Sequence, residues 1–272
     1  MVDSTTPSIE ALHMVQIRFN LVELLGKRAA HGLPTRGRGD VDDVGYLVHC
    51  QLRALFGERT PQPFLPRVVG RRVDVLGYSV HDADALREAL DFAEPRWGTA
   101  LEIESREMPG TSARPWPFGR RYGYTVRVCP LVRGIREVDG ETKKWERDAY
   151  QREAEKAEAR AKAAGRPTAE ELPSGRREEV YGEWLAASFG RVGAASTGAA
   201  LVGAARLESF RLVRLLRRTH AVQRQARTMT RPDATLAGEL EVVDGDAFTR
   251  FLAHGVGRHK AFGFGMLRLR PL

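Results

Sequence analysis

The sequence has few cysteines and no long hydrophobic run. Its two cysteines, Cys50 and Cys129, have no metal-ligand spacing and form no disulfide framework. No run of residues approaches the length of a membrane span, and residues 1–13 contain no apolar stretch typical of a signal peptide. These absences predict a cytoplasmic protein without a membrane segment.

Several motifs of nucleotide-binding and nucleic-acid-binding proteins are also absent. The sequence contains no Walker loop, no helix-turn-helix signature and no RNP-type aromatic strand motif. The stretch GVGRHKAFG, residues 255–263, does not follow a predicted strand, as a dinucleotide-binding loop would. A Rossmann enzyme, an ordinary RNA recognition motif and a helix-turn-helix regulator are therefore disfavoured.

The sequence does contain an excess of positive charge. Lysines and arginines total 43 against 35 acidic residues, which gives a net charge of +8 and a pI near 9.9. A surface of this kind suits a nucleic acid, because neutralising phosphates supplies affinity whatever the base sequence. A surface adapted for solubility, or the arginine bias of a GC-rich genome, would give the same totals.

Hydrophobic patterns occur in the same order twice along the chain. In the first half the segments are strand 13–24, helix 41–56, strands 63–80, helix 82–93 and strand 98–108. In the second half they are 120–134, 178–190, 205–222 (strand or helix), 235–245, 246–255 and a final strand. Asp40 and Asp82 are placed to cap the two helices of the first half. The order predicts an α+β fold of two tandem ferredoxin-like (RRM-like) domains, residues 1–112 and 113–272.

One segment of the second half does not fit this order. Residues 136–177 contain an Ala/Glu/Lys/Arg tract of about six helical turns that is polar on nearly every face. Such a helix stands off the body, packs on a partner or is weakly ordered. We predict a helical, finger-like insertion at about 136–190, followed by a mobile Gly/Ala-rich loop at 190–205.

A glycine-rich loop, 255–265, lies between the last predicted helix and the last strand. It contains Gly255, Gly257, Gly263 and Gly265, with Arg258, His259 and Lys260 at its tip. Glycines allow the backbone to approach a ligand closely, and successive N–H groups can hold phosphate oxygens. The loop is either an anion-binding loop or a tight turn that needs small residues.

The helix at 41–56 carries Asp42, Tyr46, His49 and Arg53 at spacings that place them on one face, away from the apolar stripe. A histidine, a phenol and a guanidinium on one face could perform acid–base chemistry on a phosphodiester. A solvated helix face with a capping aspartate is the alternative.

Two other segments mix arginines with apolar side chains. Residues 211–227 would form a basic ribbon or a basic helix face suited to a nucleic-acid groove, unless they are a solvated charge run. Residues 114–124, RPWPFGRRYGY, could stack bases, although a proline-rich interdomain linker explains them as well.

Together these segments resemble the CRISPR-associated endonucleases of the RAMP superfamily that cut repeat RNA, and most closely the subtype found with type I-E complexes. That family has a loop of the form G-[IV]-G-x-x-K-x-x-G-x-G-x-L, which GVGRHKAFGFGML, residues 255–267, matches at every position. YLVHCQLRALF, residues 46–56, resembles the family's first helix, whose cleavage histidine falls on His49. The charged segment 136–177 departs from the type I-E pattern and also fits a type IV relative.

The resemblance implies two tandem ferredoxin-like domains and a metal-independent endoribonuclease with no cofactor. Such an enzyme binds the stem-loop of CRISPR repeat RNA and cuts at its base, and the ribose 2′-OH attacks to give a 2′,3′-cyclic phosphate. Other subunits of a CRISPR effector complex are the further expected partners, with the product hairpin kept bound. The alternative is a related subunit that holds the RNA hairpin without cutting it.

The resemblance and the residue patterns together assign candidate roles. His49 would be the base or acid, Tyr46 would position the ribose or the leaving group, and Arg38 and Arg53 would hold the phosphate. The candidate RNA-binding residues are Arg36, Arg206, Arg211, Arg214, Arg217, Arg218, Arg224, Arg227, Gly255, Gly257, Arg258, His259, Lys260, Gly263 and Gly265.

Overall fold

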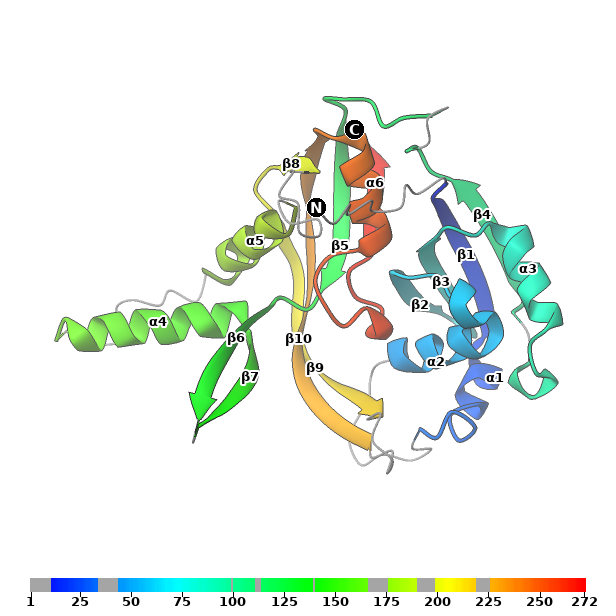
Figure 1. Ribbon diagram of the computed structural model, residues 1–272, viewed down its shortest axis with the longest axis horizontal. Coiled ribbons are helices and arrows are strands. Elements are labelled where there is room, and N and C mark those ends of the chain that lie inside the picture. The colour runs from blue at the N-terminus through cyan, green and yellow to red at the C-terminus, as the bar shows by residue number, and fades with distance from the viewer. Residues whose placement is uncertain are drawn as a thin grey trace, which may run out of the picture.

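The structure is a computed structural model that describes residues 11–33, 44–98, 100–110, 114–138, 140–165, 176–189, 199–218 and 226–272. Within these residues the chain forms two antiparallel sheets, and a separate two-stranded hairpin stands beside the second sheet (Figure 1). The predicted α+β class with tandem ferredoxin-like units is confirmed by the order of helices and strands in each half.

The first sheet has the strand order β2-β3-β1-β4. Its strands are β1 (His13–Asn20), β2 (Phe64–Val69), β3 (Arg72–Ser79) and β4 (Glu102–Glu107). The helices of this half are α1 (Leu21–Gly26), α2 (Gly45–Phe56) and α3 (Ala83–Asp91). Alternate residues of β1, Val15, Ile17 and Phe19, are buried in one core with the apolar stripe of α2, as period-two and helical spacing require.

The helix starts of the first half follow partly from capping. Asp82 caps α3 as predicted, and its carboxylate accepts a hydrogen bond from the backbone N–H of Ala85 at 2.8 Å. Asp40, the other predicted cap, lies outside the described residues. The described part of α2 begins after Val44, which makes no side-chain cap.

The second sheet has the order β11-β5-β10-β8, and β9 pairs with β10. Its strands are β5 (Arg121–Val128), β8 (Ala200–Val202), β9 (Arg206–Arg218), β10 (Ala226–Val242) and β11 (Leu267–Pro271), and its helices are α5 (Arg176–Phe189) and α6 (Gly245–His254). The segment at 205–222, which the sequence left open, is strand for residues 206–218. The β9–β10 ribbon runs on past the rest of the sheet and curves toward α2 (Figure 1).

The prediction of a helical insertion was wrong for the first part of that segment. Residues 131–148 form the hairpin of β6 (Leu131–Val138) and β7 (Glu141–Asp148), and only α4 (Ala149–Ala163) is the predicted polar helix. Val132, Ile135 and Trp145 favour strand over helix, and the turn at Gly140 has a φ of 76°, which glycine adopts readily. The hairpin and α4 do stand off the body (Figure 1).

Two other expectations for the second half are also corrected. The helix predicted at 178–190 is α5, but it is buried against the second core at Tyr181, Leu185 and Phe189 as a helix of the second unit, so the insertion does not extend to residue 190. Residues 200–202 of the predicted mobile loop are strand β8, and 190–198 lie outside the described residues.

The two halves pack directly on each other. The buried hydroxyl of Tyr78 in β3 donates a hydrogen bond to the carbonyl of Leu267 in β11 at 2.8 Å. A small third core lies where the second sheet, the hairpin and the glycine-rich loop meet, formed by Cys129, Leu131, Val213, Leu215, Phe262 and Phe264. The division into domains 1–112 and 113–272 stays a prediction.

Candidate functional site

The first helix and the glycine-rich loop meet at one place. Tyr46 of α2 stacks on Phe262, which belongs to the short 3-10 helix η4 (Lys260–Phe262), with ring centroids 5.1 Å apart. The same tyrosine lies beside His49 at 6.0 Å and packs on the third core. Tyr46 and His49 are both partly buried, whereas Arg53 is exposed and Asp42 lies outside the described residues, so the middle of this helix face is not solvated as the alternative interpretation predicts.

His49 is held in an apolar environment. Its ring lies parallel to that of Phe64 at a centroid distance of 6.5 Å, and its buried Nδ1 has no hydrogen-bond partner among the described residues. Burial, followed by the positive charge of Arg53, lowers the pKa of His49 from 6.5 to about 4. The imidazole is therefore neutral at pH 7, and it can accept a proton there.

Arg53 extends from the same helix and pairs with Glu58 at 2.7 Å. We expect Arg53→Gln to raise the pKa of His49, because the positive charge that disfavours the imidazolium is removed. Burial is the larger cause, so the pKa should stay below 6.5. An NMR titration of the histidine signals in the free protein measures this shift, with Arg59→Gln as the control. An unchanged or lower pKa of His49 in Arg53→Gln would contradict the assignment.

The glycines of the loop are required by its own packing. Gly255, Gly257, Gly263 and Gly265 all have positive φ. A Cβ at Gly263 would lie 2.4 Å from Cδ of Pro66 in β2, and one at Gly265 would lie 2.3 Å from the carbonyl oxygen of Val256. The loop therefore closes on itself and fits against the first sheet only with glycine at these positions.

The backbone of the loop is largely occupied by protein contacts. The N–H groups of Gly255, Gly263 and Gly265 donate to the carbonyls of Phe251, Lys260 and Arg127. These three N–H groups therefore already have acceptors within the protein, and the role of the loop glycines in binding RNA stays a prediction. Their role in this structure is to shape the loop that presents its basic tip.

The basic tip of the loop consists of Arg258, His259 and Lys260. His259 is in the left-handed region at a φ of 61°, and its ring lies edge-on to Phe262 at 5.8 Å. Burial lowers the pKa of Lys260 to about 8. Arg258 pairs with Glu146 of β7 at 3.2 Å, so the tip also contacts the hairpin. Phe262, two residues after Lys260, contacts Tyr46 on the helix that carries His49.

Part of the charge of the ribbon arginines is matched within the protein. Arg206 pairs with Glu208 at 2.9 Å. The buried carboxylate of Asp233 accepts hydrogen bonds from Arg127 at 2.8 Å and Arg211 at 2.9 Å. Burial would raise the pKa of Asp233, but the two guanidiniums hold it below its usual value. Arg211 is therefore partly neutralised, although its side chain remains exposed.

Arg214 is exposed on β9 and has no ion-pair partner among the described side chains. Arg217 and Arg227 face each other in the β9–β10 register, and Arg218 is opposite Ala226; the side chains of these three arginines are not described. Near this end of the ribbon, Leu216 packs against the core formed by the first sheet and α2. The predicted residues Arg36, Arg38 and Arg224 lie outside the described residues.

The aromatic segment at 114–124 is mostly structural. The indole of Trp116 is buried, donates to the hydroxyl of Thr249 at 3.0 Å and lies edge-on to Phe248 at 5.0 Å. Tyr124 is buried in β5. Only Phe118 is an exposed ring in this segment, so base stacking by the segment as a whole is not supported.

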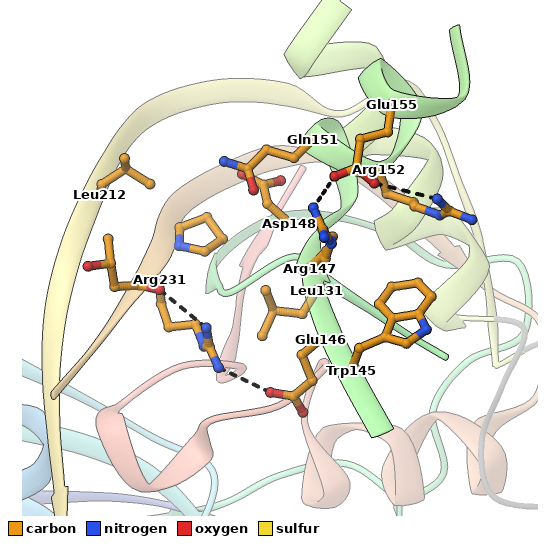
Figure 2. A pocket seen from close by; sticks show the side chains of 12 residues that line it. Leu131, Trp145, Glu146, Arg147, Asp148, Gln151, Arg152, Glu155, Leu212 and Arg231 are labelled. Atoms are coloured by element: carbon orange, nitrogen blue, oxygen red, sulfur yellow. Dashed lines mark hydrogen bonds and ion pairs between the residues drawn. The ribbon is translucent and has the colours of Figure 1, made fainter. Parts of the chain in front are cut away.

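Sequence inspection missed the hairpin as a contributor to the site. A cleft of about 740 Å³ lies between the hairpin with α4 and the β9–β10 ribbon, and Figure 2 shows Glu146 and Arg231 pointing toward each other across it. Glu146 contacts three arginines, Arg133, Arg231 and Arg258. The cluster was missed because Glu146 lies in the segment predicted as helix from residue 136 onward, so the predicted strand at 120–134, with Arg133, had no partner strand there.

Within the described ranges, no three His, Cys, Asp or Glu side chains are grouped so that they could hold a metal ion. No helix in the part of the chain that the structure describes is both long and apolar enough to cross a bilayer.

The fold and the site define a class, that of proteins with two ferredoxin-like units and a glycine-rich loop before the last strand. The CRISPR endoribonuclease Cse3 bound to a 19 nt RNA has this fold, with 15% identity over 96% of this chain and 100% of that chain, at a TM-score of 0.52. Cse3 of Thermus thermophilus in a pre-cleavage RNA complex and Cas6e of Escherichia coli K-12 each show 14% identity, with TM-scores of 0.46 and 0.44. Both cover 96% of this chain and 100% of theirs.

Sequence comparison gives the family. A family model described as CRISPR associated protein matches residues 22–271, and the chain therefore belongs to the CRISPR-associated proteins. A search of curated protein sequences finds no match. The resemblance inferred from the loop and the first helix is thus confirmed at the level of family and fold.

Proposed function

We propose that the protein is a metal-independent endoribonuclease that binds the stem-loop of CRISPR repeat RNA and cuts at its base. The observation that carries the proposal is the contact of α2 with the glycine-rich loop, in which Tyr46 stacks on Phe262 at 5.1 Å. This contact packs the helix that carries the neutral His49 against the loop that carries the basic tip. The family membership and the fold shared with the RNA-bound Cse3 endoribonuclease support it.

The proposed reaction uses the chain's own side chains. The imidazole of His49 takes the proton of the ribose 2′-OH, and the 2′-oxygen forms a bond to the adjacent phosphorus while the bond from phosphorus to the 5′-oxygen breaks. Lys260 and Arg258 stabilise the added negative charge, and Lys260 supplies the proton that the leaving oxygen needs. Tyr46 positions the ribose. The products are a 2′,3′-cyclic phosphate and a 5′-hydroxyl.

The protonation states fit this division of roles. A histidine with a pKa of about 4 is unprotonated at neutral pH and can act as a base there without first losing a proton. A lysine with a pKa of about 8 is mostly charged at pH 7 but gives up its proton more readily than an exposed lysine. Arginines remain charged and serve only to stabilise phosphate charge.

The proposal is tested with a hairpin repeat RNA in EDTA, beside the same RNA with a 2′-deoxy residue at the cut site. Cleavage of the first RNA and no cleavage of the second are expected, because the deoxy substrate lacks the nucleophile. Cleavage of the deoxy RNA, or a need for a divalent ion, would contradict the mechanism. Both RNAs should bind equally well, which separates binding from chemistry.

RNA binding should weaken as pH rises through about 8. Lys260 is charged below its pKa and neutral above it, and burial lowers that pKa to about 8. A bound phosphate favours the charged form and moves the loss of affinity to somewhat higher pH. We expect Lys260→Arg to remove this dependence, since arginine stays charged. Hairpin affinity measured from pH 6.5 to about 9.5 at constant salt tests it; the same decline in both proteins would contradict the role of Lys260.

A hairpin-holding subunit that does not cut is the second candidate. It is favoured by one observation, the pairing of Arg53 with Glu58, which turns one predicted phosphate ligand toward another residue. Tight hairpin binding by the wild-type protein, without any cleavage in EDTA or with added divalent ions, would establish this alternative. In either case, we propose that other subunits of a CRISPR effector complex are its partners.

A further inference from the structure

Three arginines converge on one carboxylate where the hairpin meets the loop and the ribbon. Glu146 of β7 lies 3.2 Å from Arg258 of the loop, 3.3 Å from Arg231 of β10 and 3.4 Å from Arg133 of β6. Glu146 and Arg231 are largely buried, whereas Arg133 and Arg258 are about half exposed. The cluster can thus be reached from solvent on the side of Arg133 and Arg258.

The charges of this cluster do not balance. Three guanidiniums face a single carboxylate, so these four side chains together carry a charge of +2. In addition, the buried Nε–H of Arg231 has no acceptor among the described residues. A buried donor without an acceptor is unfavourable, and excess positive charge attracts an anion with several acceptor oxygens. A phosphate group supplies both the charge and the oxygens.

The position of the cluster fits a strand of RNA that leaves the cleavage site. Arg258 belongs to the same loop tip as Lys260, and Arg231 is on the β9–β10 ribbon opposite Val213 of the third core. From there the cleft opens between the hairpin with α4 and the ribbon (Figure 2). A single strand passing the tip would meet these arginines before it reached the cleft.

We propose that the cluster is a second phosphate-binding site, which takes a single-stranded flank of the RNA outside the stem-loop. In the free protein the carboxylate of Glu146 occupies the place of this phosphate, and the arginines exchange it for the RNA. This proposal rests on the proposed function, since it names a further contact of the same substrate. It predicts that Glu146 weakens RNA binding although it pairs with three arginines.

The test compares two RNAs, the hairpin alone and the same hairpin with single-stranded flanks on both sides. Glu146→Gln is expected to tighten binding of the flanked RNA by about two- to five-fold at low salt, the size of one ion pair that no longer competes with the RNA for partly exposed arginines. Binding of the hairpin alone should tighten less, because Arg258 is the one arginine of the cluster that the proposed reaction also uses. Arg231→Ala should weaken only the flanked RNA and reduce its salt slope by about 1.

The matched control is Glu153→Gln, which removes the same charge from the insertion; among the described residues Glu153 pairs with Lys156 of α4 and with no other side chain. It should bind both RNAs as the wild type does, and thermal unfolding shows whether each variant keeps its fold. Weaker binding of flanked RNA by Glu146→Gln, or no change, would overturn the proposal and leave Glu146 with a structural role only. The proposal would also be overturned if Glu153→Gln tightened binding of the flanked RNA as much as Glu146→Gln does.

The outcomes separate this proposal from the proposed function. If the wild type binds and cuts the hairpin but flanks add no affinity in any variant, the second phosphate site is refuted and the endoribonuclease is not. If the wild type binds neither RNA, the proposed function fails first. Binding of an acidic peptide at the cluster, with no effect of the flanks, would assign the surface to a protein partner and overturn the RNA proposal.

Discussion

Replacement of His49 by alanine is expected to lower the single-turnover rate of repeat-RNA cleavage by about 10²–10⁴-fold, the usual contribution of a positioned general base. The imidazole is partly buried beside Tyr46 and Phe64, and burial keeps it neutral at pH 7. Hairpin affinity should change little, because a neutral group contributes little to phosphate binding. The rate and the affinity are measured on the same RNA in EDTA.

The control for this variant is His81→Ala, which removes a histidine that lies beyond the end of β3 and outside the contact of α2 with the loop. That variant should cut at the wild-type rate. If His49→Ala keeps its rate within a few-fold, His49 is not the base of the reaction. If it loses hairpin binding as well as rate, His49 has a structural role in the contact.

The second large effect is expected on stability. Gly265→Ala places a Cβ 2.3 Å from the carbonyl oxygen of Val256 at a φ of 88°, and a backbone oxygen cannot rotate away as a side chain can. The left-handed backbone and the overlap together should lower the free energy of unfolding by about 2–5 kcal/mol. Because this loop carries Lys260 and Phe262, the cleavage rate should fall with it. Urea unfolding gives the change in stability.

Gly70→Ala separates the two causes. Gly70 lies in the β2–β3 turn at a φ of 58°, and a Cβ there meets nothing within 4 Å. This variant carries the backbone strain without the overlap, so its loss should be only about 1–2 kcal/mol, with no loss of cleavage. Equal losses of stability in the two variants would show that the loop is not tightly closed, contrary to the contacts with Val256 and Pro66.

The alternation of helices and strands was predictable because it depends on local periodicity. Apolar residues at every second position of β1 and at helical spacing in α2 predicted the ferredoxin-like order. Asp82 predicted the start of α3. The hairpin at 131–148 was missed because Lys, Glu and Arg dominate its composition. The helix prediction from those residues holds only from Ala149 onward, after Asp148 caps α4.

The arrangement of the site was predictable only in part. The loop motif and the position of His49 indicated which segments matter, but the stack of Tyr46 on Phe262 depends on how the two halves pack. The cluster around Glu146 combines residues from β6, β7, β10 and the loop, and no local pattern joins them. The same packing explains why the glycine N–H groups donate to α6, to β5 and to the loop.

The chemical ends of the RNA products test the central claim most directly. The wild-type protein is incubated with the hairpin repeat RNA in EDTA, and the two products are analysed by mass spectrometry. A 2′,3′-cyclic phosphate on one fragment and a 5′-hydroxyl on the other are predicted, because the ribose 2′-oxygen is the nucleophile. A 3′-hydroxyl with a 5′-phosphate would show that water attacks instead, and would contradict the account.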